Sequence, residues 1–293
     1  MCLSWRRVGE LRLSRSSTWL PLTAEPTSKG RNTTRTYLVT GSASGIGKET
    51  AVKLRADGHR VIGVDLRDAD IEVDLTTSEG RAALVSQATE LSGGVLDGVL
   101  AIAGLVVPDP VTVAVNHFGA VATLEGLRPL LSASESPRAA VVASLAALEE
   151  VDEPLLALIE DGDEAAALAH AATLGATANA AGSSVLYTTS KLSIARRVRT
   201  HAATDEWARA GIALNAVAPG VILTPMTAAA IETEEGRAAL NEGAPAPYGG
   251  PAAPPIAVSN LLAWLTSEEN LYVTGQVIFI DGGAESIRRP ELV

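Results

Sequence analysis

From Thr36 onward the hydrophobic and polar positions switch between two periods, and this pattern predicts an α/β chain. Short runs that are apolar on both faces are typical of strands in a parallel sheet, and each is followed by a longer stretch with helical spacing. The predicted strands lie at 37–39, 61–64, 73–75, 98–104 and 139–142. The predicted helices lie at 48–57, from 78 onward, at 111–131 and at 187–210. This order favours a parallel sheet with helices on both faces.

A glycine-rich turn joins the first predicted strand to the first predicted helix. It reads Thr40-Gly41-Ser42-Ala43-Ser44-Gly45-Ile46-Gly47. Gly41 permits the tight turn, Gly45 lets the backbone approach a pyrophosphate, and Gly47 lets the helix pack against the strand. The helix N-terminus offers N–H groups to phosphates. Strand, glycine turn and helix in this order predict a dinucleotide site.

Asp65 ends the second predicted strand, about 18 residues after the last glycine of the turn. A carboxylate there accepts hydrogen bonds from an adenosine ribose and repels a 2′-phosphate, and Ser44 offers the phosphate no positive charge. We therefore expect NAD rather than NADP. Arg67 leaves an alternative open because it could face a phosphate, although pairing with Asp68 or Asp70, or solvation, is the simpler interpretation.

Composition narrows the class of protein. The chain has 293 residues, of which 47% are hydrophobic, enough for one large domain. Its net charge of −11 argues against a nucleic-acid partner. Cys2 is the only cysteine and the four histidines show no metal-ligand spacing, so we expect no metal and a cytoplasmic, reducing location. No run of 18 apolar residues occurs, so no membrane partner is expected.

Residues 1–35 differ in charge from the rest of the chain. Seven Lys and Arg residues stand there against only Glu10 and Glu25. We interpret 1–35 as a basic, disordered extension and 36–293 as the folded domain. A start codon placed too far upstream and an organelle targeting segment remain alternatives.

Tyr187 and Lys191 are four residues apart at the start of a predicted helix, which places them on one face, one turn apart. A neighbouring ammonium favours the phenolate and lowers the pKa of a phenol. This spacing predicts that Tyr187 exchanges a proton with a substrate hydroxyl. With four tyrosines and few lysines in the chain, a chance match is rare.

Five motifs in this order together resemble the short-chain dehydrogenase/reductase family over about 36–284. They are the turn at 40–47, Asp65, Tyr187 with Lys191, the run Asn215-Ala216-Val217-Ala218-Pro219-Gly220, and Ile280-Asp281-Gly282-Gly283. The resemblance implies a single Rossmann-like domain with a doubly wound sheet of seven parallel strands. It also implies hydride transfer to or from a nicotinamide cofactor.

The resemblance assigns roles to individual residues. Ser144 and Tyr187 would hold the reacting oxygen, Lys191 would hold the nicotinamide ribose, and Asn116 would position a water in a proton relay. Residues implied to bind NAD are Gly41, Ser44, Gly45, Ile46, Gly47, Asp65, Asp74, Leu75, Ala103, Gly104, Tyr187, Lys191, Pro219, Gly220, Ile222 and Thr224.

The chain departs from the family pattern at two places. The run Ala101-Ile102-Ala103-Gly104 replaces Asn-Asn-Ala-Gly, so we expect one polar tie in the central sheet to be lost, leaving only a close backbone approach at Gly104. The interval from Ser144 to Tyr187 is about thirty residues longer than is common in the family. This insert, about 148–183, contains two predicted helices, at 154–159 and 163–170.

The insert and three other parts of the chain are similar to those of the bacterial 3α-hydroxysteroid dehydrogenase/carbonyl reductase subgroup. These parts are 65–69, 115–120 and the tail with Asp281-Gly282-Gly283 followed by Arg289-Pro290. This similarity implies a 3α-hydroxysteroid or another hydrophobic alcohol or ketone as substrate. The segment 226–251 is expected to form a mobile lid, with a plain surface loop as the alternative. We also expect a homo-oligomer, in its simplest form a dimer, whose contact is changed by the insert.

Two other functions compete with this interpretation. One is a dehydrogenase of another alcohol, such as a cis-dihydrodiol or a short polyol, which would require a more polar pocket. The other is a non-catalytic NAD(H) sensor, whose mark would be loss of the catalytic residues. Ser144, Tyr187, Lys191 and Asn116 are all present in order.

Overall fold

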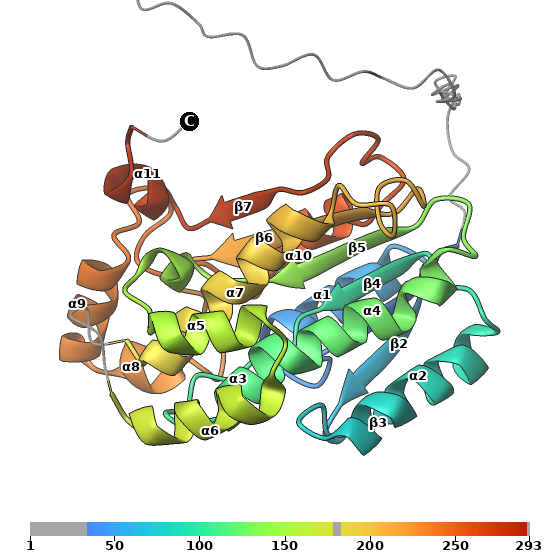
Figure 1. The fold of residues 1–293 in the computed structure, drawn as a ribbon. Helices are drawn as coiled ribbons and strands as arrows, with labels where there is room; N and C mark the ends of the chain where they lie inside the picture. Colours follow the sequence, from blue (N-terminus) through green and yellow to red (C-terminus); the bar gives the residue numbers. More distant parts are fainter. Residues whose placement is uncertain (1–33, 178–182, 292–293) are drawn as a thin grey trace, which may run out of the picture. The chain divides into compact units, whose positions relative to one another are not determined.

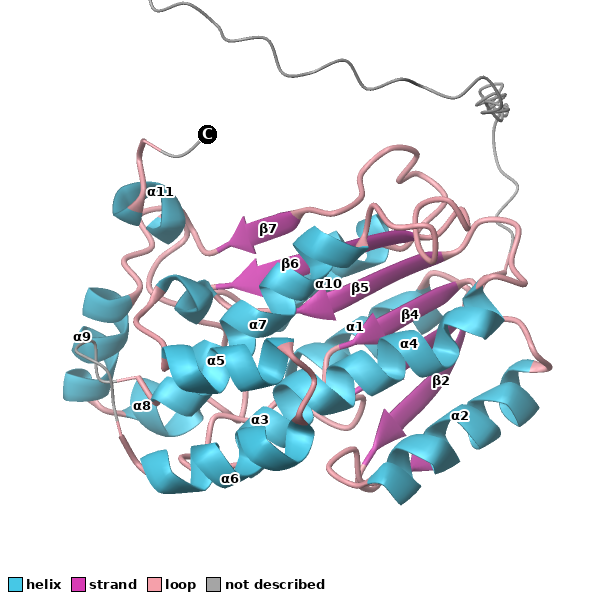
Figure 2. Cartoon of the chain, viewed as in Figure 1, coloured by secondary structure: helices cyan, strands magenta, loops and turns pink. Residues whose placement is uncertain are grey.

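The fold is described from a computed structural model that covers residues 34–177 and 183–291. Seven parallel strands form one sheet in the order β3-β2-β1-β4-β5-β6-β7. The strands are β1 (Thr36–Thr40), β2 (Arg60–Asp65), β3 (Ile71–Glu72), β4 (Gly98–Ala101), β5 (Arg138–Val142), β6 (Ala213–Pro219) and β7 (Val277–Ile280). The expected seven-stranded, Rossmann-like α/β fold is therefore confirmed (Figure 2).

Helices cover both faces of this sheet. They are α1 (Gly45–Ala56), α2 (Ser78–Ser92), α3 (Val111–Val113), α4 (Ala120–Leu131), α5 (Glu153–Glu160), α6 (Glu164–Leu174), α7 (Val185–His201), α8 (Ala228–Glu232), α9 (Glu234–Gly243), α10 (Pro255–Leu265) and α11 (Ala284–Arg288). A π-helical turn, η1 (Ala114–Gly119), joins α3 to α4, and a 3-10 helix, η2 (Leu145–Leu148), follows β5. Among the described residues, no helix is both long and apolar enough to cross a bilayer.

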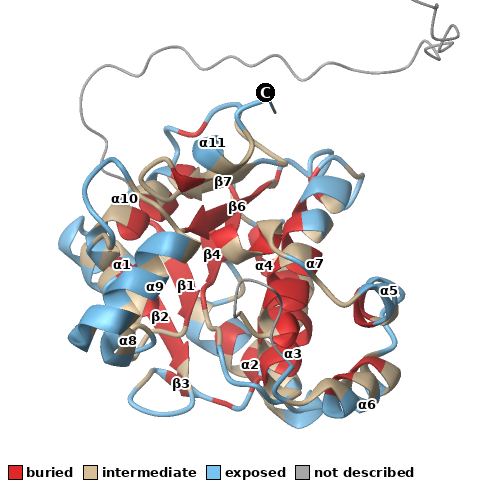
Figure 3. Ribbon diagram, turned by 90° about the vertical axis from the view of Figure 1, so that its left-hand side faces the viewer, coloured by how far each residue is buried: buried red, intermediate tan, exposed pale blue. Residues whose placement is uncertain are grey.

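Two apolar clusters lie on opposite faces of the sheet. One contains Leu84 of α2, Leu124 of α4 and Val198 of α7. The other contains Leu54 of α1 and Leu262 of α10. The inner residues of β1, β2, β4, β5 and β6 are almost completely buried (Figure 3), which explains why these sequences are apolar on both faces, whereas β7 is partly exposed.

A third apolar cluster joins the insert to the domain. Leu155 and Ile159 of α5 and Ala171 of α6 pack with Phe118 of η1 and Leu186 of α7. The side chain of Arg81 on α2 makes two contacts of 2.7 Å with the carboxylate of Glu164 on α6. The two helices expected in the insert are therefore present and pack beside the helix that carries Tyr187. Residues 178–182 of the expected insert lie outside the described residues.

Arg35 was assigned to the extension, but its side chain is buried and belongs to the domain. It donates to the carbonyl oxygens of Asp97 and Ser136 at 2.8 and 2.7 Å and to the Tyr37 hydroxyl at 3.1 Å. These bonds hold the starts of β1, β4 and β5 together. Residues 1–33 of the expected extension lie outside the described residues.

The prediction of a third strand at 73–75 is wrong. The strand in this part of the chain, β3, ends at Glu72. Val73 N still bonds to Asp65 O at 3.0 Å, but the Asp74 side chain then accepts bonds from the backbone N and the hydroxyl of Thr76. Thr77 caps α2 by accepting from Gly80 N. Short polar side chains compete with strand pairing in this way and turn the chain into the helix.

The helix at 187–210 was predicted to end too late, because α7 ends at His201. The following turn is held by Trp207, which is buried in the core and accepts a backbone bond from Ile212. Gly211 closes the turn at φ +79°. The burial of a bulky aromatic side chain overrides the helical preference of the segment.

Candidate active site

An open cleft lies at the carboxyl ends of β1, β4, β5 and β6, the edge of the sheet where ligands bind in doubly wound folds. Figure 1 shows the arrowheads of β5, β6 and β7 pointing toward the side where α8, α9 and α11 lie. Fourteen of the predicted residues line the cleft: Gly41, Ser44, Gly45, Ile46, Gly47, Ala103, Gly104, Ser144, Tyr187, Lys191, Pro219, Gly220, Ile222 and Thr224. The cleft brings together the glycine turn and α7, the helix that carries Tyr187, from distant parts of the sequence.

The glycine turn has the geometry expected of a phosphate cradle. Gly41 and Gly45 have φ of +71° and +52°, which residues with a side chain rarely adopt. A Cβ on Gly47 would lie 2.1 Å from Gly41 O, so α1 can approach β1 only with glycine there. Ser44 precedes α1 without making a side-chain cap, which leaves the first N–H groups of the helix available to a phosphate. These residues fit a dinucleotide.

Ser144 and Tyr187 meet at the inner end of the cleft. Ser144 starts η2, and its hydroxyl accepts a bond of 3.1 Å from Ala146 N. Tyr187 lines the same cleft, close enough to Ser144 for the serine to lower the pKa of its phenol. Two hydroxyl groups are thus held side by side, an arrangement that can bind one substrate oxygen between them.

Burial raises the pKa of the Tyr187 phenol, the hydrogen bond from Ser144 lowers it, and the charge of Glu149 raises it further. The expectation that Lys191 makes this phenol acidic is wrong for the structure described here. Burial lowers the pKa of Lys191 to about 8. Its ammonium donates to Val142 O at 2.9 Å and lies 5.8 Å from the centre of the Tyr187 ring.

Asn116 lies in η1 and is buried beside the cleft rather than lining it. Its side chain accepts from Leu105 N at 2.8 Å and donates to Leu105 O and Ser190 Oγ at 2.9 and 3.1 Å. These bonds fasten the loop after β4 to α7. A π-helical turn in an α-helix often marks a functional site, and no pattern in the sequence predicted this one.

Asp65, Asp74 and Leu75 also lie outside the lining of the cleft. Asp65 nevertheless touches the glycine turn, because its Oδ2 accepts a bond of 2.9 Å from Ala43 N. Asp70 pairs with Arg55 at 3.4 Å, so the suggested pairing of Arg67 with Asp70 is not the contact that forms. Arg67 is exposed.

Thr40 makes a tie between β1 and the residues after β4 that was not predicted from the sequence. The Thr40 hydroxyl accepts bonds from Ile102 N at 2.9 Å and Ala103 N at 3.1 Å. The expectation that only the backbone approach at Gly104 remains is therefore wrong. The same bonds end β4 at Ala101, earlier than the predicted 104.

Sequence reasoning missed several residues that line the cleft: Ile102, Val142, Ala143, Pro225, Met226 and Thr227. Thr227 is the most informative of them. Its hydroxyl bonds to the carbonyl oxygens of Ile222 and Thr224 and accepts from Thr224 N, which fixes the turn that leads into α8. The threonines three residues apart in the run 224–227 were a signal for such a turn.

The chain is similar to known oxidoreductases over most of its length. The family model described as enoyl-(acyl carrier protein) reductase matches residues 41–285. The 3-alpha-hydroxysteroid dehydrogenase/carbonyl reductase of Comamonas testosteroni is 34% identical over 258 residues, which is 86% of this chain and 97% of that protein. Levodione reductase of Leifsonia aquatica is 29% identical and covers 89% of this chain and 97% of its own length.

Solved structures agree with these relationships. The crystal structure of the 3-alpha-hydroxysteroid dehydrogenase from Pseudomonas sp. B-0831, complexed with NADH, has a TM-score of 0.79 and 34% identity, and covers 88% of this chain and 100% of that one. A putative gluconate 5-dehydrogenase from Beutenbergia cavernae with bound NADP has a TM-score of 0.67 at 23% identity, and covers 86% and 97%. The second likeness concerns the fold alone. The matched family model, the identity of the relatives and the shared sheet show that this chain belongs to the short-chain dehydrogenase/reductase family, whose oxidoreductases bind a nicotinamide cofactor and act on alcohol and carbonyl groups.

Proposed function

We propose that this enzyme interconverts a hydrophobic secondary alcohol, such as a 3α-hydroxysteroid, and its ketone with NAD(H). The observation that carries the proposal is that Ser144 and Tyr187 line one cleft together with the glycine turn. One side of such a cleft suits a dinucleotide and the other suits the oxygen of a small substrate. When bound, the cofactor supplies the hydride acceptor or donor.

The side chains of the cleft have distinct roles in this proposal. Ser144 and Tyr187 hold the substrate oxygen, and Tyr187 accepts its proton during oxidation or returns it during reduction. Lys191 holds the cofactor ribose with its buried ammonium, which the bond to Val142 O keeps in place at the cleft. Asn116 keeps the loop after β4 against α7, so that Gly104 stays close to the Lys191 ammonium.

We propose NAD rather than NADP because of Asp65. Its carboxylate is fastened to the glycine turn through Ala43 N, at the position where a 2′-phosphate would meet a second negative charge. The relative with 34% identity was solved with NADH. Asp74 and Leu75 are proposed as the edge of the adenine pocket, and Thr224 as a partner of the carboxamide.

The side chains on the substrate side of the cleft favour a hydrophobic ligand. Met226 lines the cleft and remains about half exposed, as does Leu223 at its edge. The helices α8 and α9 of the segment 226–251 bury no residue, whereas its ends are fixed by paired bonds between 221–223 and Ala253. Tyr248 N also bonds to Gly282 O at 3.0 Å, so the part of the segment that is free to move is α8 and α9. We propose that these two helices move as a lid and close over the substrate.

We further propose a cytoplasmic homodimer. The insert helices cover part of η1 and α7, and this surface is then unavailable to a second subunit. Small-angle scattering should report a particle of two chains. A tetramer whose subunits meet across α4 and α7 would contradict the proposal that the insert makes this surface unavailable.

The function can be tested with a panel of alcohols and ketones followed at the NADH absorbance band. The panel should contain 3α- and 3β-hydroxysteroids, a cis-dihydrodiol, a short polyol and a bulky aromatic ketone, each with NAD(H) and NADP(H). The proposal predicts the highest kcat/KM for 3α-hydroxysteroids or bulky ketones with NAD(H). Activity confined to NADP(H), or to polyols, would contradict it.

A further inference from the structure

Two threonines stand between Tyr187 and Lys191 on α7. Thr188 and Thr189 are fully buried and lie outside the lining of the cleft. Threonine is a weak helix former, because its side chain is branched at Cβ and its hydroxyl competes for backbone hydrogen bonds. Two successive buried threonines in this helical turn therefore indicate contacts that lie outside the helix.

Both hydroxyls bond to the backbone of the insert. The Thr188 hydroxyl donates to Glu150 O at 2.8 Å, which is shorter than its bond of 3.3 Å to Val185 O in its own helix. Thr189 Oγ1 accepts a bond of 3.0 Å from Asp152 N. Partly buried backbone groups need hydrogen-bond partners, and α7 supplies them here to the loop between η2 and α5.

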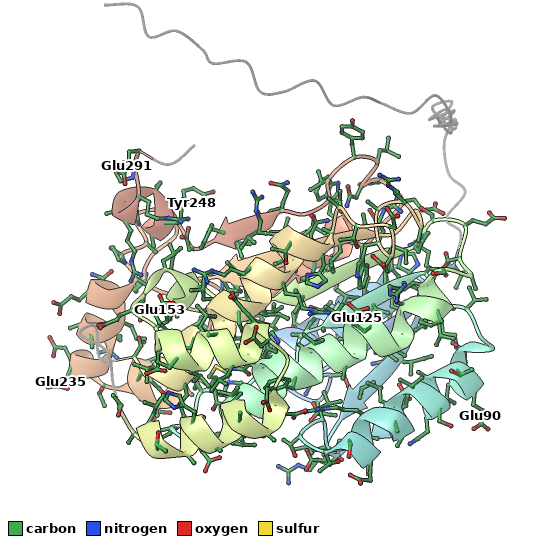
Figure 4. All side chains as sticks on the ribbon, viewed as in Figure 1. Glu90, Glu125, Glu153, Glu235, Tyr248 and Glu291 are labelled. Atoms are coloured by element: carbon green, nitrogen blue, oxygen red, sulfur yellow. The ribbon has the colours of Figure 1, made fainter. Side chains whose placement is uncertain are left out.

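The same loop leads into the two helices of the insert. The Asp152 carboxylate caps α5 by accepting from Leu155 N at 2.8 Å, and it lies 2.9 Å from His170 Nε2 on α6. The next residue, Glu153, is exposed at the start of α5 (Figure 4). The bond from Asp152 N to Thr189 thus fixes the residue that caps one insert helix and contacts the other.

Ser144 lies at the other end of this segment. It follows β5, where Ala143 N donates to Val217 O at 2.8 Å, and η2 leads from it to the loop. The helix η2 packs against α7. The segment from Ser144 to Asp152 is therefore fixed by the sheet at its start and by the two threonines at its end.

We propose that Thr188 and Thr189 are positioning residues of the active site. By fastening the insert loop to α7, they keep Ser144 at the spacing from Tyr187 that lets both side chains bind one substrate oxygen. The inference rests on the proposed role of Ser144 and Tyr187 at that oxygen. It gives the insert a part in the reaction without contact with the substrate, because small errors in the placement of reacting groups slow catalysis strongly.

The first test is the rate of alcohol oxidation in Thr188→Val and Thr189→Val. Valine keeps the shape of threonine but leaves Glu150 O or Asp152 N without this partner. In each variant kcat should fall roughly ten- to a hundredfold, while the Kd for NADH stays within about twofold of wild type, because the glycine turn is untouched. Thr188→Ser and Thr189→Ser keep the hydroxyl and should restore most of kcat. Wild-type kcat in both valine variants would overturn the proposal.

A matched control separates positioning from a general loss of stability. Thr266 is also fully buried, and its hydroxyl bonds to Leu262 O at 2.8 Å in the turn that ends α10, outside the lining of the cleft. All variants are assayed below their unfolding temperatures, and Thr266→Val should then leave kcat unchanged. A loss of kcat in Thr266→Val as large as in Thr188→Val and Thr189→Val would contradict the positioning role.

A double-mutant cycle with Ser144→Ala tests how the threonines act. Because they are proposed to act by placing Ser144, Thr189→Val should lower kcat much less in the Ser144→Ala background than in wild type. Losses of kcat that simply multiply in the double variant would show that Thr189 does not act through Ser144, and would overturn the inference.

A further readout needs neither turnover nor a variant that folds. Hydrogen exchange of the wild-type protein should show a protected amide at Asp152, because its N–H is bonded to Thr189. Exchange at the rate of an unstructured loop would contradict the inference. If wild type shows no turnover, or Tyr187→Phe retains it, the proposed function fails; if turnover needs Tyr187 but both valine variants keep the wild-type kcat, only the inference about the threonines fails.

Discussion

Lys191 donates a hydrogen bond of 2.9 Å to the carbonyl oxygen of Val142, the last residue of β5. Ser144 lies two residues further along the chain, so the ammonium and the serine hydroxyl are fixed by the same strand end. This bond holds the lysine across the cleft from the glycine turn without any contribution from a ligand. The same bond holds the Lys191 ammonium in a buried site, where removal of a charge from water costs free energy.

Replacing Lys191 with Met should therefore separate stability from activity. Burial lowers the pKa of Lys191 from 10.5 to about 8, so the folded protein binds a proton here less readily than the unfolded chain. The cost is of the order of 3 kcal/mol below pH 8, and it disappears as the pH rises from about 8 toward 10.5.

In that pH range the wild-type protein should gain stability relative to Lys191→Met, and near pH 7 the variant should unfold at no lower temperature than wild type. Its turnover should be almost lost. Thermal unfolding at several pH values, together with a rate assay, checks both expectations. A variant that is much less stable than wild type at pH 7 would show that the Val142 bond outweighs the cost of burial.

Thr40→Val should weaken the central sheet and change little else. The substitution keeps the shape of the side chain but leaves the N–H groups of Ile102 and Ala103 without their acceptor, at a cost of about 2 kcal/mol. Thr40→Ser keeps the hydroxyl and serves as the control. Urea unfolding measures the difference, and equal midpoints for the valine and serine variants would show that the hydroxyl does not tie the strands.

Asp65→Asn tests the origin of the cofactor preference. The variant keeps the shape of the side chain and removes the charge that would repel a 2′-phosphate, so the ratio of kcat/KM for NADP(H) to that for NAD(H) should rise roughly tenfold or more. Asp57→Asn, on the surface at the end of α1, is a charge-matched control. An unchanged ratio in Asp65→Asn would mean that another group selects the cofactor.

The sequence predicted those parts of the fold whose signals are local. The apolar runs of β1, β2 and β5, the glycine turn and the Tyr187–Lys191 spacing each lie within a few residues, and each has its expected place in the structure. The two insert helices were also foreseen, because their stretches are rich in Glu, Leu and Ala, and in the structure Asp152 and Asp163 cap them.

What the sequence could not predict depends on contacts between distant segments. The Thr40 hydroxyl ties β1 to the residues that follow β4, and the buried Trp207 shortens α7. The pairing of Glu149 with Arg288 joins residues that are almost half the chain apart. The acidity of Tyr187 was misjudged for the same reason, since burial and Glu149 both act through the folded structure.

The central claim is that Tyr187 moves the proton between substrate and protein. The most direct measurement is the turnover of Tyr187→Phe beside its affinity for NADH, since the substitution removes one hydroxyl group and leaves the aromatic ring. The account predicts that kcat falls by at least about a thousandfold while the Kd for NADH stays within about threefold of wild type. A Tyr187→Phe enzyme that keeps most of its kcat would contradict the account.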